Sequence, residues 1–316
     1  MRIGHVDILR GFCMMIIVWY HTNHPVLLDY PFFNTTLFFV SGLLFHPVEG
    51  RSFWTKKVTR LLVPFVFFYV LYYAFLLLIN FIKYHIISPN IAWSIFDVFK
   101  WNVDNDGYTC NYPLWFIWAL LWIQIIANYL VKWVKSDWTL FLIGFAVSLL
   151  GYRYIKHVPT PFMLGRSTSF FVYFISGYFI KKIDYIKRWK IGLPLAVLSF
   201  VVLHVWDSPI RLMGISKMIF ELIAFAVILL YISVGLQQSK LMKPLIFIGV
   251  NSMIIFGVHD MYLTVIRMIT QNTLGEMNVW LGFLNMVIVL LMMIPTILAI
   301  NKYIPVVAGK KTATIS

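Results

Sequence analysis

Charged residues are scarce in this sequence. Asp, Glu, Lys and Arg make up 12% of its 316 residues, whereas 61% are hydrophobic and 18% are aromatic. Soluble domains carry about 25% charged residues, so the composition excludes a protein that water surrounds on all sides. The chain is therefore expected to be an all-α integral membrane protein with several spans.

Cysteines and metal ligands are also few. Of two cysteines, Cys13 lies in the first apolar segment and Cys110 in a polar connection, which makes them a poor candidate pair for a disulfide. His21 and His24 are three residues apart, but no carboxylate or thiolate completes a set, so no metal site is predicted. Lys and Arg are scattered over short segments and form no basic face, which excludes nucleic-acid binding.

Apolar runs long enough to cross a membrane recur along the whole chain. A span needs about 20 mostly apolar residues. We expect about ten transmembrane helices in one bundle, at 5–23, 32–47, 61–82, 113–131, 137–152, 167–181, 190–206, 215–235, 243–267 and 278–303. This gives a single polytopic domain over residues 1–316, with a short cytoplasmic tail over 304–316.

The distribution of Lys and Arg predicts the orientation. Seventeen of them fall at the N-terminus, in the even-numbered connections and in the C-terminal tail, against eight on the opposite side. Because positive charge favours the cytoplasmic side, both termini are expected in the cytoplasm. The net charge of +14 then reflects topology and attraction to the bilayer's anionic headgroups.

The first apolar helix carries three ionisable side chains, Asp7, Arg10 and His21. At about 100° per residue, Arg10 and His21 lie within about 20° of one face and about 16 Å apart along the axis. Asp7 is three residues from Arg10, within reach on the same side. Ionisable groups in hydrocarbon cost several kcal/mol unless they are paired or face a wet cavity, so this stripe is a functional hypothesis.

The stripe allows a chemical and a purely structural interpretation. A neutral imidazole such as His21 can take a proton from a hydroxyl, and Arg10 can hold an anion or a developing oxyanion. Alternatively, Asp7 and Arg10 form a buried ion pair that fixes helix packing, and His21 is an interfacial imidazole. We favour the catalytic interpretation for the three residues together.

Further candidates follow in later helices. Lys57 and Arg60 lie at the cytoplasmic mouth of the third predicted span, either as ordinary anchors or as a phosphate-binding pair. Ser41 precedes Gly42, a pair that suits helix packing as well as a substrate channel. The other candidate cavity-lining residues are Trp115, Arg166, Glu221, Ser252 and His259.

Two of these candidates have specific alternatives. Trp115 fits an aromatic belt at the membrane surface as well as a ligand platform. His259 either lines the same cavity as His21 or makes a structural hydrogen bond between helices. Its neighbour Asp260 is seven residues from Arg267, on nearly the same face, and is expected to form an ion pair with it.

The longest polar connection runs from Lys83 to Pro113. Its stretch NVDNDGYTCNYP contains Asp104, Asp106 and Asn111, side chains of the kinds that grip sugars. A solvated loop rich in turn-forming residues explains the same composition. A calcium loop is excluded because the ligand spacing and the terminal Glu are missing.

Six segments together resemble the membrane-bound acyltransferase 3 family. VDILRGFCMMIIVWYH resembles its first-helix motif, FFVSGLLF its second-helix signature, and KKVTRLLVPF its Arg-x-x-Arg segment. PLWFIWAL, GRSTSFFVYFISGYFIKK and IGVNSMIIFGVHDMYL resemble later blocks in the expected order. The sequence departs from the family at Lys57, which replaces the first Arg, keeps the charge and loses the bidentate geometry.

The resemblance implies a ten-helix enzyme of the bacterial inner membrane. Such enzymes take an acyl group, usually acetyl, from cytoplasmic acyl-CoA and pass it to a hydroxyl of a cell-envelope glycan or its lipid-linked precursor. Arg10 and His21 would be the essential pair, with His21 as base or acyl carrier, and Lys57, Arg60 and Arg10 would hold acetyl-CoA. We expect a stand-alone version without the hydrolase-like domain of some members. A transporter or flippase for a glycan or acyl group fits the same charged helix.

Overall fold

The structure, a computed structural model, is helical almost throughout. It describes residues 4–22, 32–102, 110–206, 211–274 and 278–310. Its helices and strands are α1 (Gly4–Tyr20), α2 (Phe32–Leu43), α3 (Gly50–Lys57), α4 (Val63–Tyr84), α5 (Pro89–Trp93), β1 (Trp101–Asn102), α6 (Trp115–Trp133), α7 (Asp137–Arg153), β2 (Thr160–Pro161), α8 (Leu164–Lys182), α9 (Tyr185–Val205), α10 (Arg211–Leu236), α11 (Lys243–Val250), α12 (Ser252–Leu274), α13 (Val279–Met292) and α14 (Ile294–Tyr303). The two strands form one short antiparallel pair, in which Trp101 faces Pro161.

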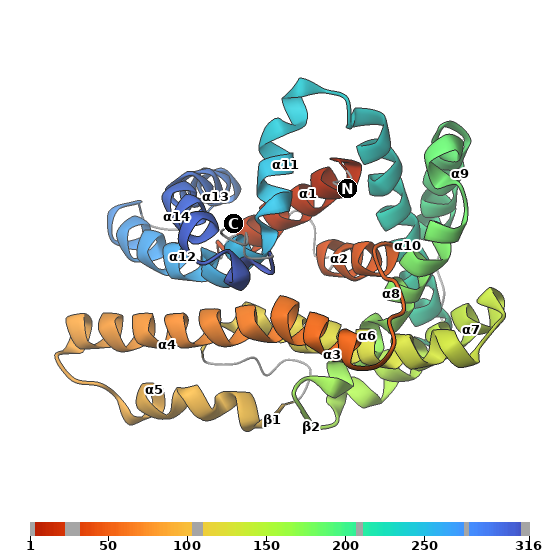
Figure 1. Ribbon diagram of the computed structural model, residues 1–316. Coiled ribbons are helices and arrows are strands. Elements are labelled where there is room, and N and C mark those ends of the chain that lie inside the picture. Colours follow the sequence, from red (N-terminus) through yellow and green to blue (C-terminus); the bar gives the residue numbers. More distant parts are fainter. Residues whose placement is uncertain (1–3, 23–31, 103–109, 207–210, 275–277, 311–316) are drawn as a thin grey trace, which may run out of the picture.

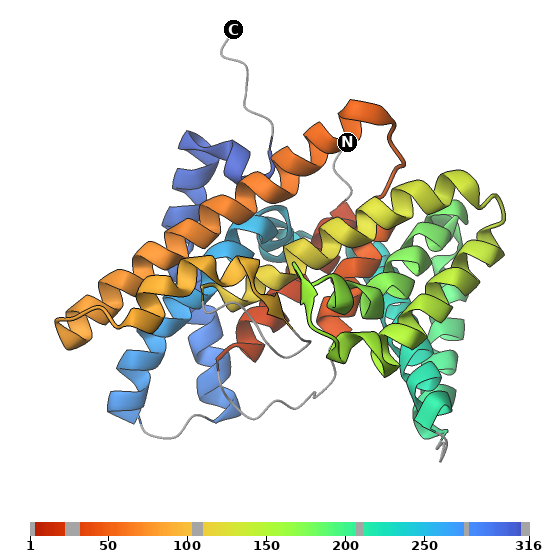
Figure 2. The same cartoon turned by 90° about the horizontal axis from the view of Figure 1, so that it is seen from below.

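Helix α1 lies at the centre of the bundle. It contacts α2, α10, α11, α12 and α13. Helices α12 to α14 lie on one side of it, and α7 and α9 lie on the other (Figures 1 and 2). The long helix α4 runs along one edge and packs against α12. The stripe of ionisable residues on α1 is therefore enclosed by protein, as such groups require in a membrane.

Two reciprocal glycine contacts bring backbones together around the centre. A Cβ on Gly11 of α1 would overlap the carbonyl oxygen of Leu245, and one on Gly249 of α11 would overlap that of Asp7. In the same way, Gly42 of α2 lies against Phe174 of α8, and Gly177 of α8 lies against α2. Membrane helices use small residues for such close approach. Gly42 therefore serves packing, whereas its neighbour Ser41 faces a cavity.

The α1–α11 contact predicts a stability effect. Replacing Gly249 by Ala forces the two backbones apart and is expected to lower stability by about 1–3 kcal/mol, as overpacking does. The unfolding temperature of the purified protein in detergent measures the effect. Gly214→Ala on α10 is the matched control, because its added Cβ meets nothing within 4 Å. Equal unfolding temperatures for the two variants would contradict the close packing.

One predicted span is broken in the structure. The span predicted at 243–267 divides at Asn251 into α11 and α12. The one predicted at 278–303 is a continuous helix, Val279–Tyr303, with a local irregularity at Met293 between α13 and α14. Asn251 accepts hydrogen bonds from Asn301 Nδ2 at 2.8 Å and Lys310 Nζ at 3.0 Å. The break at Asn251 is thus held by residues distant in sequence, which is why the apolar pattern alone did not predict it.

The predicted count of ten spans is not confirmed. In the described part of the chain, six helices have the length and the apolar composition to cross a membrane: Gly50–Tyr84, Tyr112–Trp133, Tyr185–Val205, Met213–Leu236, Ser252–Thr270 and Val279–Tyr303. Helices α1 and α7 have 17 residues each and α2 has 12. Most of α2 and the central part of α8 are buried, and packed helices of this kind do not need a uniformly apolar surface.

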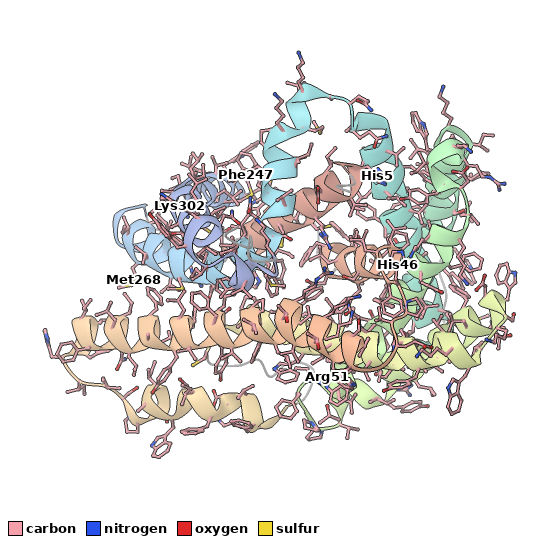
Figure 3. All side chains as sticks on the ribbon, viewed as in Figure 1. His5, His46, Arg51, Phe247, Met268 and Lys302 are labelled. Atoms are coloured by element: carbon pink, nitrogen blue, oxygen red, sulfur yellow. The ribbon has the colours of Figure 1, made fainter. Side chains whose placement is uncertain are left out.

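Apolar side chains cover the periphery of the bundle. On α9, Leu195, Leu198 and Val202 are 58%, 59% and 58% exposed. Exposed apolar residues also lie along α4, and Figure 3 marks Phe247 of α11 and Met268 of α12. A soluble protein rarely exposes large contiguous apolar patches, so this surface suits lipid. The architecture is that of a multi-pass helical membrane protein.

Candidate functional site

Two cavities lie end to end along one face of α1. The larger has a volume of about 620 Å³ and is lined by Arg10 and Met14 of this helix. The smaller, of about 170 Å³, is lined by Ile17 and His21. These four positions follow one another at helical spacing, so the predicted stripe is a continuous face that borders both cavities.

Three other helical segments border both cavities as well. Helix α2 contributes Phe33 to the smaller cavity and Ser41 to the larger. Helix α6 contributes Trp115 to the smaller cavity and Phe116 to the larger. Phe256 of α12 lines both cavities. Its ring, 6% exposed, therefore stands where the two cavities meet.

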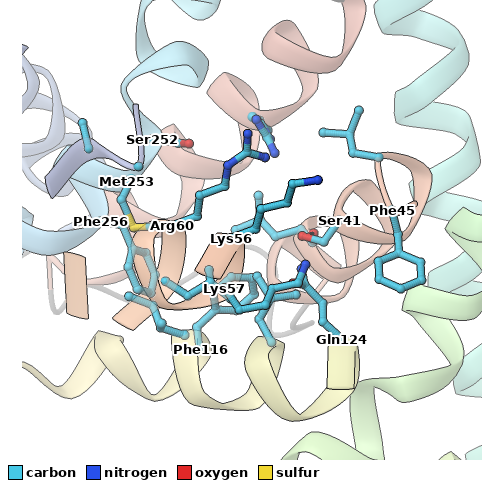
Figure 4. A pocket seen from close by; sticks show the side chains of 18 of the residues that line it. Ser41, Phe45, Lys56, Lys57, Arg60, Phe116, Gln124, Ser252, Met253 and Phe256 are labelled. Atoms are coloured by element: carbon cyan, nitrogen blue, oxygen red, sulfur yellow. Dashed lines mark hydrogen bonds between the residues drawn. The ribbon is translucent and has the colours of Figure 1, made fainter. Parts of the chain in front are cut away.

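Cations gather in the larger cavity. Figure 4 shows the side chains of Lys56, Lys57 and Arg60 together on one side of it. Arg10 is a fourth cation in the lining, and none of the described residues that line the cavity is acidic. Concave surfaces lined by one sign of charge concentrate ligands of the opposite sign. This cavity is therefore suited to an anion.

Three of these cations, Lys56, Lys57 and Arg60, lie in or just before an irregular turn of one helix. The helix that begins with α3 continues through a π-helical turn, Val58–Leu62, into α4. Such turns are rare and are often found at functional sites. Lys57 comes just before the turn, and its Nζ lies 5.6 Å from the ring centroid of Phe45 and 5.2 Å from that of Phe53. Arg60, within the turn, and Lys56 are exposed, so they lie at the open part of the cavity.

Beyond the cations, most residues that line the larger cavity are apolar, with His46 and Gln124 among the polar exceptions. Met14, Leu37, Phe116, Leu120 and Phe256 line it. Ser41 and Ser252, both predicted as cavity-lining, also border it. The cavity thus joins a cationic entrance to an apolar interior, a combination that fits a long ligand with a charged end and an apolar arm.

The smaller cavity combines an imidazole, aromatic rings and a guanidinium. His21 shares it with Tyr20, Tyr112, Trp115 and Arg166. The Arg166 guanidinium carbon lies 3.6 Å from the centroid of the Trp115 ring, a close cation–π contact. Trp115 is only 4% exposed, so it belongs to this cavity rather than to an aromatic belt at the membrane surface.

The ring of His259 lies next to the ring of His21. The two ring centroids are 5.3 Å apart, although His259 is fully buried and lines neither cavity. The next residue, Asp260, accepts hydrogen bonds from Tyr72 at 2.5 Å and Arg267 at 2.7 Å. The predicted ion pair between Asp260 and Arg267 is therefore present, and it lies beside the two imidazoles.

Besides His259, which was predicted to line a cavity and does not, two more predicted residues lie away from the cavity linings. Asp7 is 8% exposed and its backbone packs against Gly249 of α11. Its carboxylate interacts electrostatically with Arg10, which does line the larger cavity. Glu221 of α10 pairs instead with His204 Nδ1 of α9, at 2.7 Å, and lines neither cavity. The sequence alone could not identify the helix that packs beside Glu221.

The described residues of the polar connection after Lys83 pack against the helix bundle. Asn111 donates from Nδ2 to the carbonyl of Gly257 at 2.8 Å, which ties the entrance of α6 to α12. Cys110, buried and free like Cys13, lies 3.0 Å from Ser94 Oγ, and burial raises the pKa of its thiol. The predicted sugar-contacting residues Asp104 and Asp106, like His24, lie outside the described residues.

Sequence reasoning missed several lining residues. In the sequence, Lys56 is one of the cations that predict the orientation of the chain and is not a predicted site residue. Its spacing of four from Arg60 nevertheless places both on one helix face. Ala308 and Gly309 also line the larger cavity, and a Cβ on Gly309 would lie 3.4 Å from the Arg60 carbonyl oxygen. Ala308 and Gly309, which fall in the segment predicted as a tail, thus pack near the cationic entrance, and no local pattern indicates this contact.

Fold and cavities together define a multi-pass membrane protein with an internal cavity lined by cations. The model of the acyltransferase 3 family, described as an acyltransferase domain, matches residues 3–302. The chain therefore belongs to this acyltransferase family. Neither a search of curated proteins nor a search of solved structures gives a match.

Proposed function

We propose that this protein is an O-acyltransferase that moves an acyl group, in the simplest case acetyl, from acyl-CoA to a hydroxyl of a cell-envelope or exported glycan. The observation that carries the proposal is the arrangement of the two cavities along α1. One has four cations and an apolar interior, the other contains an imidazole, and Phe256 stands at their junction.

The donor fits the larger cavity by its chemistry. The nucleotide end of CoA carries several phosphate charges, which Lys56, Lys57 and Arg60 can neutralise. Its pantetheine arm is long and mostly uncharged, as is the lining beyond these cations. Arg10 lies between the entrance and Met14, deep enough to interact with the thioester. In this arrangement the thioester points along α1 toward Phe256 and His21.

The acceptor occupies the smaller cavity in this proposal. His21 removes the proton of a sugar hydroxyl while the oxygen attacks the thioester carbonyl. The new ester C–O bond forms, the C–S bond breaks, and the CoA thiolate takes the proton from the His21 imidazolium. Arg10 stabilises the oxyanion that develops on the carbonyl. Aromatic side chains such as Tyr20 and Tyr112 provide surfaces for the sugar ring.

The orientation follows from the positive charge on the connections. With the Arg60 entrance at the cytoplasmic side, the donor would enter from the cytoplasm and the acyl group would reach the acceptor toward the opposite face. A bacterial inner-membrane location agrees with this, because acyl-CoA is cytoplasmic and the glycan is assembled outward. No resident cofactor is needed, since the thioester itself is the activated substrate.

An assay of acyl transfer in detergent, where no membrane separates two compartments, tests the proposal. Purified protein in detergent is incubated with radiolabelled acetyl-CoA and with polysaccharide or lipid-linked glycan extracted from the producing cells. We expect the label to appear in the glycan with one free CoA thiol released per ester. A transporter or flippase, which broken helices such as α11–α12 would also suit, gives no labelled glycan. Release of thiol without glycan would show hydrolysis and would equally refute the proposal.

A further inference from the structure

The buried imidazole of His259 has one ring nitrogen in use and one unused. Its Nδ1 lies 3.0 Å from the carbonyl oxygens of both Ile255 and Phe256. Only a protonated nitrogen can donate to a carbonyl, so the hydrogen of the neutral ring is on Nδ1. Nε2 is then a bare acceptor, and within the described part of the chain it has no hydrogen-bond partner. Leaving such a buried group unpaired costs about 1–3 kcal/mol.

The ring of His21 is a polar group that lies next to the His259 ring. The ring centroids are 5.3 Å apart and the planes are inclined at 47°. An N–H···N hydrogen bond of about 3 Å between two imidazoles separates their centroids by about 5 Å. The rings therefore have the right separation, and a rotation of the His21 ring would align the bond. Catalytic hydrogen bonds are often poorly aligned until the substrate is bound.

We infer that His259 is a positioning residue for His21. Its Nε2 accepts a hydrogen bond from one ring nitrogen of His21, and the other nitrogen of His21 is then the unprotonated one that faces the smaller cavity. This inference rests on the proposed function, in which that nitrogen receives the hydroxyl proton. His259 itself touches no substrate, because it is 0% exposed and lines neither cavity.

The surroundings explain why an imidazole, rather than a carboxylate, accepts the hydrogen bond from His21. Asp260 already accepts a hydrogen bond at each oxygen, from Tyr72 and from Arg267, and these two bonds hold its carboxylate in place. A neutral acceptor fixes the tautomer without placing a further charge in the membrane. When His21 is transiently protonated, the nearby Asp260 carboxylate stabilises the imidazolium at a distance. The proton returns to the leaving thiolate, so His259 ends each cycle unchanged.

Two variants separate positioning from packing. His259→Phe keeps the ring shape and removes the acceptor, whereas His259→Gln can place an amide oxygen near the position of Nε2. We expect the Phe variant to lower kcat about 100-fold, a general-base effect, with KM for acetyl-CoA unchanged, and the Gln variant to recover at least about 10-fold of that loss. His157→Phe, at an exposed histidine of the Ile155–His157 turn, is the matched control and should leave kcat unchanged.

A measurement that does not depend on turnover completes the test. Nitrogen NMR of histidine-labelled protein, assigned with His21→Ala, should show His21 in one tautomer in the wild type and in a mixture in His259→Phe. Unchanged tautomer signals, a normal kcat in His259→Phe, or no recovery in His259→Gln would overturn the inference. Failure of the proposed function is distinguishable, because then the wild type lacks transfer whereas the tautomer signals still report the histidine pair.

Discussion

Replacing His21 by alanine is expected to abolish acyl transfer while the protein still folds and inserts. His21 supplies the imidazole that lines the smaller cavity, and the nearby His259 is fully buried and cannot replace it. Loss of a general base costs about 10²–10⁴-fold in rate, which brings transfer close to background. The assay is radiolabel incorporation into glycan from acetyl-CoA, and yield and unfolding temperature in detergent report folding.

Donor binding should survive this substitution. The cations of the larger cavity lie beyond Met14 and Phe256 from His21, so the Kd for acetyl-CoA should stay within about twofold of wild type, since distant sites contribute independently. His157→Ala, at an exposed histidine that lines neither cavity, should retain full activity. A His21→Ala enzyme with normal turnover would refute the proposed mechanism.

Removing the cations at the entrance is expected to raise KM for acyl-CoA without changing kcat at saturation. Hydrogen bonds to charged groups contribute about 1.5–3 kcal/mol each, so Arg60→Ala should raise KM about 10- to 100-fold. The Lys57→Ala/Arg60→Ala double variant should raise it further. A rise in KM alone is the signature of interactions made equally in the ground and transition states.

Lys57 offers a sharper version of this test. Lys57→Arg restores the residue that the family pattern has at this position and allows bidentate contact with a phosphate, so KM should stay the same or fall. Arg51→Ala is the matched control, because Arg51 is an exposed cation on the same helix, α3, that does not line the cavity. A lower kcat with unchanged KM in Arg60→Ala would show that these cations do not hold the donor.

The candidate site was partly visible in the sequence because much of it lies on one helix. The spacing of Arg10, Met14, Ile17 and His21 alone gives a common face. The pairing of Asp260 with Arg267 was visible for the same reason. Glu221 shows the limit of this reasoning, since its partner His204 lies on another helix. The role of Gly309 beside Arg60 had no local signal at all.

Composition and helical periodicity by themselves determined the membrane class, the helical architecture and the stripe on α1. Composition needs no spatial information, and periodicity depends only on the fixed angle per residue within one helix, so neither needs another part of the chain. The tertiary structure alone decided that α2, α6 and α12 complete the cavities with α1, that a helix break occurs at Asn251, and that His259 lies beside His21. These outcomes depend on close backbone contacts such as Gly11 with α11, which join residues more than 200 positions apart.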